Sequence, residues 1–381
     1  MAEPVTTAWL TGEQLAGRAA EWRALAEEAV EPNVFAGPEC FLPALRHLDG
    51  GRTHFLVAER GGRLAGLLPL RFSRARWGVP LACAIHHLPY APHGAPLIAR
   101  GDAPGVAVAL LDALLEHRSS PTSLLLQHMP AAGPLADVWT QALAASGREM
   151  VRFAPFERPA MRKDGAAYLA ARMSKHRRRR LEQQRRKLHV EAGETEIAVA
   201  VEPAALAAAL ERFFALEAAG WKGRRGTAAG QEAARAAFFR ESTAALAEKR
   251  EARIVEIIRG DAPIAAALLF IAQGRAWFFK TAYDETLARY SPGVLLDIAV
   301  TEALDGDPDI ALGDSLAVTP DPGFEALWRE RLPMADWLVA LDRGASMRFA
   351  ISARLEALRR AARERAKQAV GYMRAKRGLK A

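Results

Sequence analysis

The sequence predicts an α+β protein of two tandem domains with mixed central sheets, followed by a basic C-terminal helix. The chain has 381 residues, which suits two domains at roughly 150 residues each. Helical and extended patterns succeed one another along both halves. A strand, an Arg-Gly turn and an Ala/Leu-rich strand occur at 57–72 and again at 256–271. We expect one architecture used twice, although two hairpins can also resemble each other by coincidence.

The positive charge is concentrated in two segments. The chain has 52 Lys+Arg and 44 Asp+Glu, a formal net charge of +8. Residues 172–190 contain nine Lys or Arg and one Glu, a net charge of +8. Residues 346–381 contain eleven Lys or Arg and two Glu, a net charge of +9, so the rest of the chain carries −9. We interpret the protein as an acidic body with two cationic helices.

Composition excludes several classes of protein. Cys40 and Cys83 are the only cysteines, too few for a disulfide framework or a cysteine-based zinc site, and they fit a reducing cytoplasm. The N-terminus has no basic segment followed by an apolar run, so we expect no secretory signal. The longest apolar stretch, near 264–272, is far shorter than the roughly 20 residues of a spanning helix. Any membrane contact is therefore expected to be peripheral.

The first half alternates helices and strands. A helix is expected over 13–30 and a hairpin of strands at 53–59 and 63–72. The elements expected after it are strands at 81–86 and 95–99, a helix at 105–117, a strand at 123–128, a helix at 134–146 and a strand at 149–153.

The second half repeats this order after a basic helix at 166–188. The elements expected there are a strand at 195–202, helices at 203–219 and 230–250, a hairpin at 252–258 and 263–272, a strand at 275–283, a helix at 293–304, and strands at 310–312 and 335–341. The Pro-rich stretch 154–159 marks the expected boundary, which gives domains at 1–155 and 156–345. Residues 346–381 form a basic amphipathic helix whose apolar seam is Ile351, Leu355, Leu358, Ala362, Val370 and Met373.

This order of elements resembles the GNAT acyl-CoA N-acyltransferase fold. In that fold the mixed sheet opens between its fourth and fifth strands. The resemblance implies that the gap accepts the pantetheine arm of an acyl-CoA and that the N-terminus of the following helix receives the pyrophosphate.

Two segments of the second half carry residues suited to ligand binding. Ser291-Pro292-Gly293 precedes a helix whose amide groups and dipole can meet a phosphate, although an ordinary helix N-cap explains the same residues. The loop Trp221-Lys222-Gly223 follows a helix, and exposed Trp and Lys in loops often bind ligands. The alternative for this loop is a glycine-terminated helix with its Trp folded onto the core.

Motifs in these segments resemble a known family. W-K-G-x-x-G-T at 221–227 and Y-D…Y-S-P-G-x-L-L at 283–296 are similar to the acetyltransferase domain of the CelD/BcsL cellulose-biosynthesis-associated family, which is related to the tandem-domain Fem peptidyltransferases. The basic run 174–186 and Leu312-Gly313-Asp314 resemble further motifs of that family. The resemblance covers roughly 165–330, and 315–324 departs from the family pattern, which puts the usual acceptor pocket in doubt.

The family implies acyl transfer from a CoA thioester to an amine or hydroxyl, without a metal. For this chemistry we expect Asp314, at a strand end facing the opening of the sheet, as the preferred base and Glu217 as the second candidate, with Tyr283 or Tyr290 as proton donor to the leaving thiolate. The residues assigned to acetyl-CoA or a longer acyl-CoA are Phe278, Lys280, Ser291, Pro292, Gly293, Val294 and Leu295. Those assigned to the acceptor are Trp221, Lys222, Gly223 and Asp284. A turn carboxylate remains the alternative for Asp314, and a core or rim aromatic for each tyrosine.

Other chemistries find little support. The sequence has no Walker loop, dinucleotide-binding glycine motif or nucleophile elbow, which argues against kinase, dehydrogenase and hydrolase activity. His86, His87 and His93 lie in a Pro-rich loop without Cys or carboxylate at ligand spacing, so we rank contact with a substrate above metal binding.

The expected function is a cytoplasmic, acyl-CoA-dependent acyltransferase acting on a cell-envelope, polysaccharide or lipid-amine acceptor. The alternatives are a Fem-like peptidyltransferase that uses aminoacyl-tRNA and a degenerate scaffold protein of exopolysaccharide synthesis. The cationic segments suit peripheral contact with an anionic membrane, whereas nucleic acid is disfavoured because stacking aromatics are nearly lacking. Helices docked by their apolar seams on the acidic body are the alternative.

Overall fold

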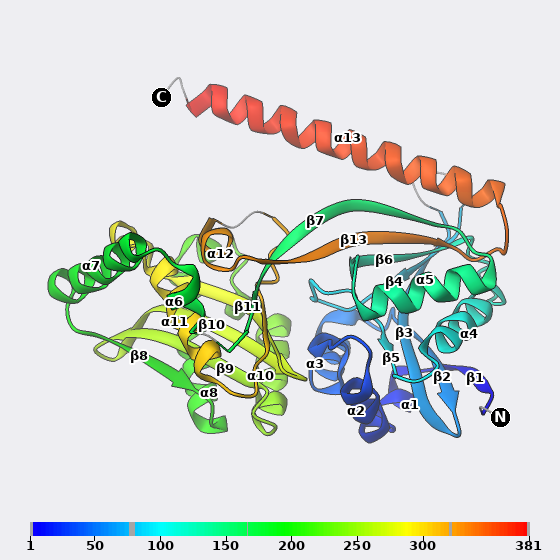
Figure 1. Ribbon diagram of the computed structural model, residues 1–381, viewed down its shortest axis with the longest axis horizontal. Helices are drawn as coiled ribbons and strands as arrows, with labels where there is room; N and C mark the ends of the chain where they lie inside the picture. Colours follow the sequence, from blue (N-terminus) through cyan, green and yellow to red (C-terminus); the bar gives the residue numbers. More distant parts are fainter. Residues whose placement is uncertain (1–2, 76–80, 166, 320–321, 379–381) are drawn as a thin grey trace.

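The computed structural model describes residues 3–75, 81–165, 167–319 and 322–378, and gives the backbone only for residues 192, 322 and 370–378. It consists of two lobes joined by two long strands (Figure 1). The elements of the first part of the chain are β1 (Val5–Leu10), α1 (Gly12–Ala16), α2 (Ala19–Glu28), η1 (Val34–Ala36), α3 (Pro38–Ala44), η2 (Leu45–Asp49), β2 (His54–Arg60), β3 (Arg63–Ser73), β4 (Cys83–His86), β5 (Leu97–Ile98), α4 (Ala103–Leu115), β6 (Ser123–Pro130), α5 (Pro134–Ser146) and β7 (Met150–Arg162).

The rest of the chain repeats the pattern of helices, hairpin, strand and helix. Its elements are α6 (Tyr168–Arg172), α7 (Lys175–Ala192), β8 (Thr195–Ala200), α8 (Pro203–Ala219), α9 (Trp221–Arg224), η3 (Ala229–Gln231), α10 (Ala233–Ala247), β9 (Ala252–Arg259), β10 (Ala262–Ala272), β11 (Arg275–Tyr283), η4 (Glu285–Tyr290), α11 (Pro292–Gly306), β12 (Leu312–Asp314), α12 (Pro322–Leu327), β13 (Glu330–Ala340) and α13 (Met347–Gly378).

One mixed sheet of 13 strands runs through both lobes. Its order is β1-β2-β3-β4-β6-β13-β7-β12-β11-β10-β9-β8, and β5 pairs with β3. Both expected hairpins are present, as β2–β3 and β9–β10, each antiparallel. The α+β class predicted from the sequence is confirmed.

The lobes exchange strands at their junction. β13, the last strand of the chain, lies between β6 and β7, antiparallel to both. β7 pairs with β13 from Met150 to Ala160 and with β12 from Ala160 to Arg162, so it belongs to both lobes. The stretch 154–159, expected as a boundary, therefore lies inside a strand. Pro155 is tolerated there because the register shifts at this point of the ladder, where a missing N–H costs little.

Two expected helices are interrupted. The helix expected over 13–30 breaks between α1 and α2, where Gly17 ends the first of them. The helix expected over 166–188 begins at a residue outside the described part of the chain, and it breaks at Met173, which has an extended backbone. Ser174 then caps α7 by accepting a hydrogen bond from the Arg177 amide.

Helices cover both faces of the sheet. The largest apolar cluster joins α2, α3, α8 and α10 to the sheet and spans both lobes. Within it, Phe35 of the first lobe packs against Trp277 and Phe279 of β11, with ring centroids 6.1 and 5.0 Å apart. Separate clusters bury α4 and α5 on the first lobe and α11 and α12 on the second. The lobes therefore share a core as well as a sheet.

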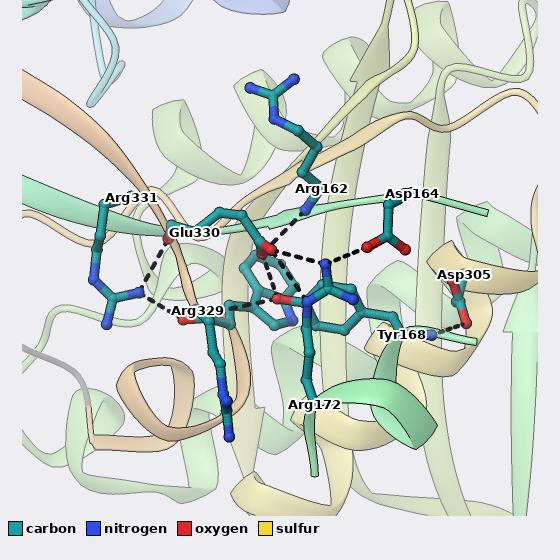
Figure 2. A network of polar contacts seen from close by, with 9 residues as sticks. Arg162, Asp164, Tyr168, Arg172, Asp305, Arg329, Glu330 and Arg331 are labelled. Atoms are coloured by element: carbon teal, nitrogen blue, oxygen red, sulfur yellow. Dashed lines mark hydrogen bonds and ion pairs between the residues drawn. The ribbon is translucent and has the colours of Figure 1, made fainter. Parts of the chain in front are cut away.

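The start of β13 is tied to α6 by a polar network (Figure 2). Glu330 accepts hydrogen bonds from the Tyr168 hydroxyl at 2.6 Å, from Arg172 Nε at 3.1 Å and from the Arg162 amide at 3.3 Å. Burial opposes ionisation of Glu330, but the hydrogen bond from Tyr168 keeps the pKa of Glu330 below its usual range. These contacts fix α6, the segment that leads into α7.

Helix α13 packs on the first lobe through its first turns only. Phe349 is buried against Leu338 and Ala340 of β13, and Arg360 pairs with Asp336 at 2.7 Å. Residues 361–369 are exposed, and the side chains of Val370 and Met373, expected in the apolar seam, lie outside the described residues. No helix in the described ranges combines the length and the apolar character that crossing a membrane requires.

The shared strands predict that neither lobe folds alone. A fragment of residues 1–155 lacks β13, which supplies a neighbour to both β6 and β7. We expect this fragment to show no cooperative thermal transition by circular dichroism, and fragments 1–155 and 156–381 to co-purify when expressed together. A cooperative melt of the isolated 1–155 fragment would contradict the strand exchange.

Candidate functional site

The sheet opens between β11 and β12. The two strands pair in parallel only from Arg275 to Trp277 and from Leu312 to Asp314. Beyond Trp277, β11 continues to Tyr283 with β10 as its neighbour on the other side. The register with β10 shifts at Phe279, since Phe278 opposes Leu269 whereas Lys280 opposes Leu268. This bulge leaves one residue of β11 unpaired at the mouth of the opening.

A cavity of about 300 Å³, here called the donor cavity, occupies this opening. Its lining residues come from β11, η4, α11 and the segment around α12: Phe278, Thr281, Tyr283, Ala288, Ser291, Pro292, Gly293, Val294, Asp297, Gly323 and Phe324. Phe278 is buried, and its ring meets Phe324 edge-on at 4.7 Å. Of the seven residues assigned to acyl-CoA, five line the donor cavity.

The N-terminus of α11 faces the donor cavity without a side-chain cap. Ser291 precedes the helix in the left-handed region, with φ 57°, and its side chain makes no capping hydrogen bond. The ordinary N-cap considered for Ser291 is therefore absent. The first-turn amides of a helix have no intrahelical partners, so those of Gly293 and Val294 are suited to an anion. A Cβ on Gly293 would stand 3.5 Å from the Tyr283 ring, so the glycine leaves more space between α11 and Tyr283 than a larger residue would.

A second, smaller cavity adjoins the first. This acceptor cavity, about 120 Å³, is lined by Leu216, Glu217, Gly220, Trp221, Lys222, Thr281, Ala282, Tyr283 and Glu285. Thr281 and Tyr283 line both cavities. The two cavities therefore meet at the end of β11, one on the α11 side and one on the α8–α9 side.

Glu217 is the carboxylate of the acceptor cavity. Its side chain is buried, and it accepts hydrogen bonds from Lys222 Nζ at 2.8 Å and from the Ala229 amide at 2.6 Å. Lys222 Nζ also donates to the Thr281 carbonyl at 2.8 Å. Lys222 thus joins Glu217 to the strand end that the two cavities share.

The segment that carries Trp221, predicted as a loop, forms the short helix α9 and leaves the Trp221 side chain exposed to solvent. Trp221 is 43% exposed, with the Arg225 guanidinium 5.0 Å from its ring centroid, so it is not folded onto the core. Gly223 is required here, since a Cβ would stand 1.7 Å from the Ala218 carbonyl oxygen. Close approach between α8 and α9 therefore explains Gly223 without a direct role in binding.

Glu285 was missed by the sequence analysis. It accepts hydrogen bonds from the Trp221 amide at 2.6 Å and from Arg224 at 2.5 Å. The Arg224 hydrogen bond and that of the Trp221 amide hold the pKa of Glu285 below its usual range. Two features of the sequence could have indicated Glu285: it comes just after a predicted strand, and a separate loop is rich in Arg. Its neighbour Asp284, assigned to the acceptor, instead caps η4 by accepting from the Thr286 amide and hydroxyl.

The structure places two of the expected catalytic residues away from both cavities. Asp314 is fully buried, with Oδ2 3.4 Å from Arg158 Nη1 and Oδ1 accepting from the Leu316 amide at 2.8 Å. Asp314 lines neither cavity and is one partner of a buried ion pair, so its role as a base stays a prediction that the structure does not favour. Tyr290 is also fully buried, and its hydroxyl donates to Glu191 of α7 at 3.0 Å. It cannot protonate a thiolate in the donor cavity.

Two residues assigned to acyl-CoA also lie elsewhere. Lys280 Nζ donates to the Tyr90 hydroxyl of the first lobe at 2.8 Å, and burial lowers the pKa of Lys280. The bulge at Phe279 is the reason, because it turns Lys280 to the face opposite Phe278. Leu295 lines a different cavity, between α7 and α11.

The corresponding place in the first lobe is closed. β4 and β6 also pair in parallel and then separate after Ile85 and Leu125. There Gly94 packs so tightly that a Cβ would stand 1.7 Å from the Gln127 carbonyl oxygen. The N-terminus of α4 is capped by the Asp102 carboxylate, which accepts from the Gly105 amide at 3.0 Å. A capping carboxylate repels phosphate, so the open helix N-terminus is a feature of the second lobe.

The histidines of the first lobe are separate from both cavities. His86 and His93 are buried, and burial lowers the pKa of His86 to about 3. Within the described ranges, no three His, Cys, Asp or Glu side chains gather in a way that could hold a metal ion.

The two interpretations of Asp314 make different predictions. Replacing it with Ala leaves the buried Arg158 guanidinium without its counter-charge, so we expect the free energy of unfolding to fall by about 3–5 kcal/mol in urea denaturation. Asp284→Ala, which removes a partly exposed turn cap, should cost only about 1 kcal/mol. Unchanged stability with lost acyl transfer would restore Asp314 as a base.

Comparison with known proteins agrees with this geometry. Residues 175–309 match the model of the Acetyltransferase (GNAT) domain, a span that contains Glu217, β11 and α11. The search of curated proteins gave no match to the chain.

Solved structures of similar fold cover most of the chain. They include FemX (12% identity, TM-score 0.54, covering 86% of this chain and 94% of that one). The C-terminal domain of a putative lysylphosphatidylglycerol synthetase from Agrobacterium fabrum is 11% identical (TM-score 0.51, 86% and 92%). A conserved protein of unknown function from Bacteroides thetaiotaomicron is 10% identical (TM-score 0.54, 86% and 97%). At these identities the likeness concerns the fold, which is α+β with two tandem GNAT-like units and a basic C-terminal helix, and residues 175–309 match a GNAT acetyltransferase domain.

Proposed function

We propose that the second lobe transfers an acyl group from acyl-CoA to an amine or hydroxyl acceptor. The observation that carries this proposal is the meeting of two cavities at Thr281 and Tyr283, one of which contains an uncapped helix N-terminus. Transfer requires a donor and an acceptor that approach one reaction centre from different sides. The two cavities on either side of the end of β11 satisfy this requirement.

The residues of the donor cavity are arranged in the same order as the pyrophosphate, pantetheine and thioester of acyl-CoA. The amides of Gly293 and Val294 would bind the pyrophosphate, with the helix dipole adding to their attraction for negative charge. Phe278 and the strand beyond it would lie along the pantetheine arm. A backbone amide at the Phe279 bulge would polarise the thioester carbonyl, because the bulge frees that part of β11 from the ladder.

Glu217 is assigned as the base and Tyr283 as the proton donor. The acceptor nitrogen or oxygen attacks the thioester carbonyl carbon, and its proton passes to the Glu217 carboxylate. The C–S bond then breaks, and the CoA thiolate takes a proton from the Tyr283 hydroxyl. Lys222 orients Glu217 through the 2.8 Å hydrogen bond.

The acceptor is proposed to be the reactive end of a larger molecule of the cell envelope, such as a polysaccharide-linked group or a lipid amine. A cavity of about 120 Å³ beside the exposed Trp221 admits a functional group and leaves the remainder of the molecule outside. We also propose that the protein is related to the CelD/BcsL family. A cytoplasmic location is proposed as well, since Cys40 and Cys83 are not joined in a disulfide.

Calorimetric titration with acetyl-CoA and longer acyl-CoAs tests the donor cavity. We expect wild-type protein and Gly293→Ala to bind, since a methyl group fits at ordinary contact distance from Tyr283. Gly293→Trp should abolish binding because the indole fills the cavity. If the wild-type protein binds no acyl-CoA, the proposal fails, and aminoacyl-tRNA transfer or a scaffold role takes its place.

Measurements of turnover test the assignment of Glu217 as the base. Release of CoA thiol can be followed colorimetrically with a panel of amino-sugar and lipid-amine acceptors. Glu217→Gln should lower kcat by about a hundredfold while leaving the affinity for acyl-CoA unchanged. The matched control is Glu211→Gln on the same helix, an exposed residue paired with Arg240. Equal turnover in Glu217→Gln and wild-type protein would remove Glu217 as the base.

A further inference from the structure

The basic helix α7 presents a cationic face that the body of the protein does not neutralise. Lys175, Arg179 and Arg186 are exposed and, at helical spacing, lie on one face. Leu181 and Leu188, which are buried, lie on the opposite face. Of the Lys and Arg residues of α7, within the part of the chain that the structure describes, Lys187 alone has a carboxylate within 4.0 Å, that of Glu191 at 3.8 Å. The cationic face therefore does not serve to dock α7 on the acidic body.

An exposed apolar side chain continues this face. Val190, four residues after Arg186 and on the same face, is 75% exposed. The edge strand β8 follows, with Ile197 38% and Val199 44% exposed on one side of the strand. Ile197 lines the same cavity as Leu181, so this side of β8 lies toward the inner side of α7 and does not extend the cationic face.

The inner side of α7 has a different character. A cavity of about 340 Å³ lies between the helix and α11, and its lining includes Leu188 and Ile298. Four carboxylates (Glu182, Glu196, Glu302 and Asp305) and two guanidinium groups (Arg178 and Arg185) also line it, and this excess of negative charge makes it a poor site for an anion. An anionic partner would therefore bind on the outer face.

The base of α7 is fixed to the body. The Glu330 network of Figure 2 holds α6, and Arg177 of α7 donates to the Ala326 carbonyl at 2.7 Å. The outer face consequently has a set orientation relative to the rest of the protein, at the end of the second lobe where β8 forms the sheet edge (Figure 1).

We propose that the outer face of α7 (Lys175, Arg179, Arg186 and Val190) docks on an anionic lipid bilayer. The cations suit phosphate headgroups, and the exposed Val190 side chain suits the boundary between headgroups and acyl chains. A single-stranded nucleic acid favours Phe, Tyr or Trp side chains for base stacking, and α7 contains none of these three residue types. This proposal does not rest on acyl transfer.

Flotation with lipid vesicles tests the charge component. We expect the full chain to bind phosphatidylcholine vesicles that contain phosphatidylglycerol, to bind pure phosphatidylcholine weakly, and to dissociate at high salt. Neutralising Lys175→Gln, Arg179→Gln and Arg186→Gln together should weaken partition about a hundredfold. The matched control neutralises three exposed cations of α13, Arg363→Gln, Arg365→Gln and Lys367→Gln, and should retain most of the binding.

A further substitution separates a bilayer from other polyanions. Val190→Ser keeps every charge, so it should weaken binding to vesicles and leave binding to heparin unchanged. The proposal is overturned by equal binding to both vesicle types, by equal losses in the two triple variants, or by an RNA duplex that binds more tightly than vesicles at the same salt. Thermal melts of each variant verify that the fold is intact.

Discussion

The antiparallel pairing of β7 with β13 links the two lobes and fixes the position of the strands beside it. β13 lies between β6 of the first lobe and β7, and the end of β7 supplies the neighbour of β12 in the second lobe. Arg158 on β7 and Asp314 on β12 face each other there, both fully buried. A buried ion pair adds little net stability, but loss of one partner is costly, so the pair specifies where β12 lies. The end of β12 in turn determines where β11 loses its neighbour and where the donor cavity begins.

The two lobes have similar elements and different chemistry. Each lobe has two parallel strands that separate along their length, β4 and β6 in the first and β11 and β12 in the second. A helix lies between the two strands in the sequence, α4 in the first lobe and α11 in the second. In the first lobe the separation is filled near Gly94 and the helix N-terminus is capped by Asp102. In the second, Ser291 leaves the helix uncapped beside an open cavity. The first lobe contributes to the second through contacts such as that of Tyr90 with Lys280.

Much of the local structure could be predicted from the sequence. Both hairpins and the helices Pro134–Ser146 and Pro203–Ala219 follow from periodicity and from proline at their first positions. The Ser-Pro-Gly turn and Phe278, which were assigned to one ligand, line one cavity, and their role in binding acyl-CoA stays a prediction. Phe278 and Lys280 were both assigned to acyl-CoA, and the bulge at Phe279 turns their side chains to opposite faces of the sheet. No pattern of residues signalled the bulge.

Local sequence patterns are enough to predict the order of elements, the two concentrations of positive charge and the segments that line the cavities. These depend on neighbours in the chain: hydrophobic period, turn residues and composition. The packing of distant segments determines that β7, at the predicted boundary, is shared by both lobes and that Asp314 faces Arg158. It also determines that Lys175, Arg179 and Arg186 of α7 have no carboxylate partner among the residues that the structure describes. Each of these depends on which strand or helix from a distant part of the chain packs alongside. Local periodicity does not indicate which segment that is.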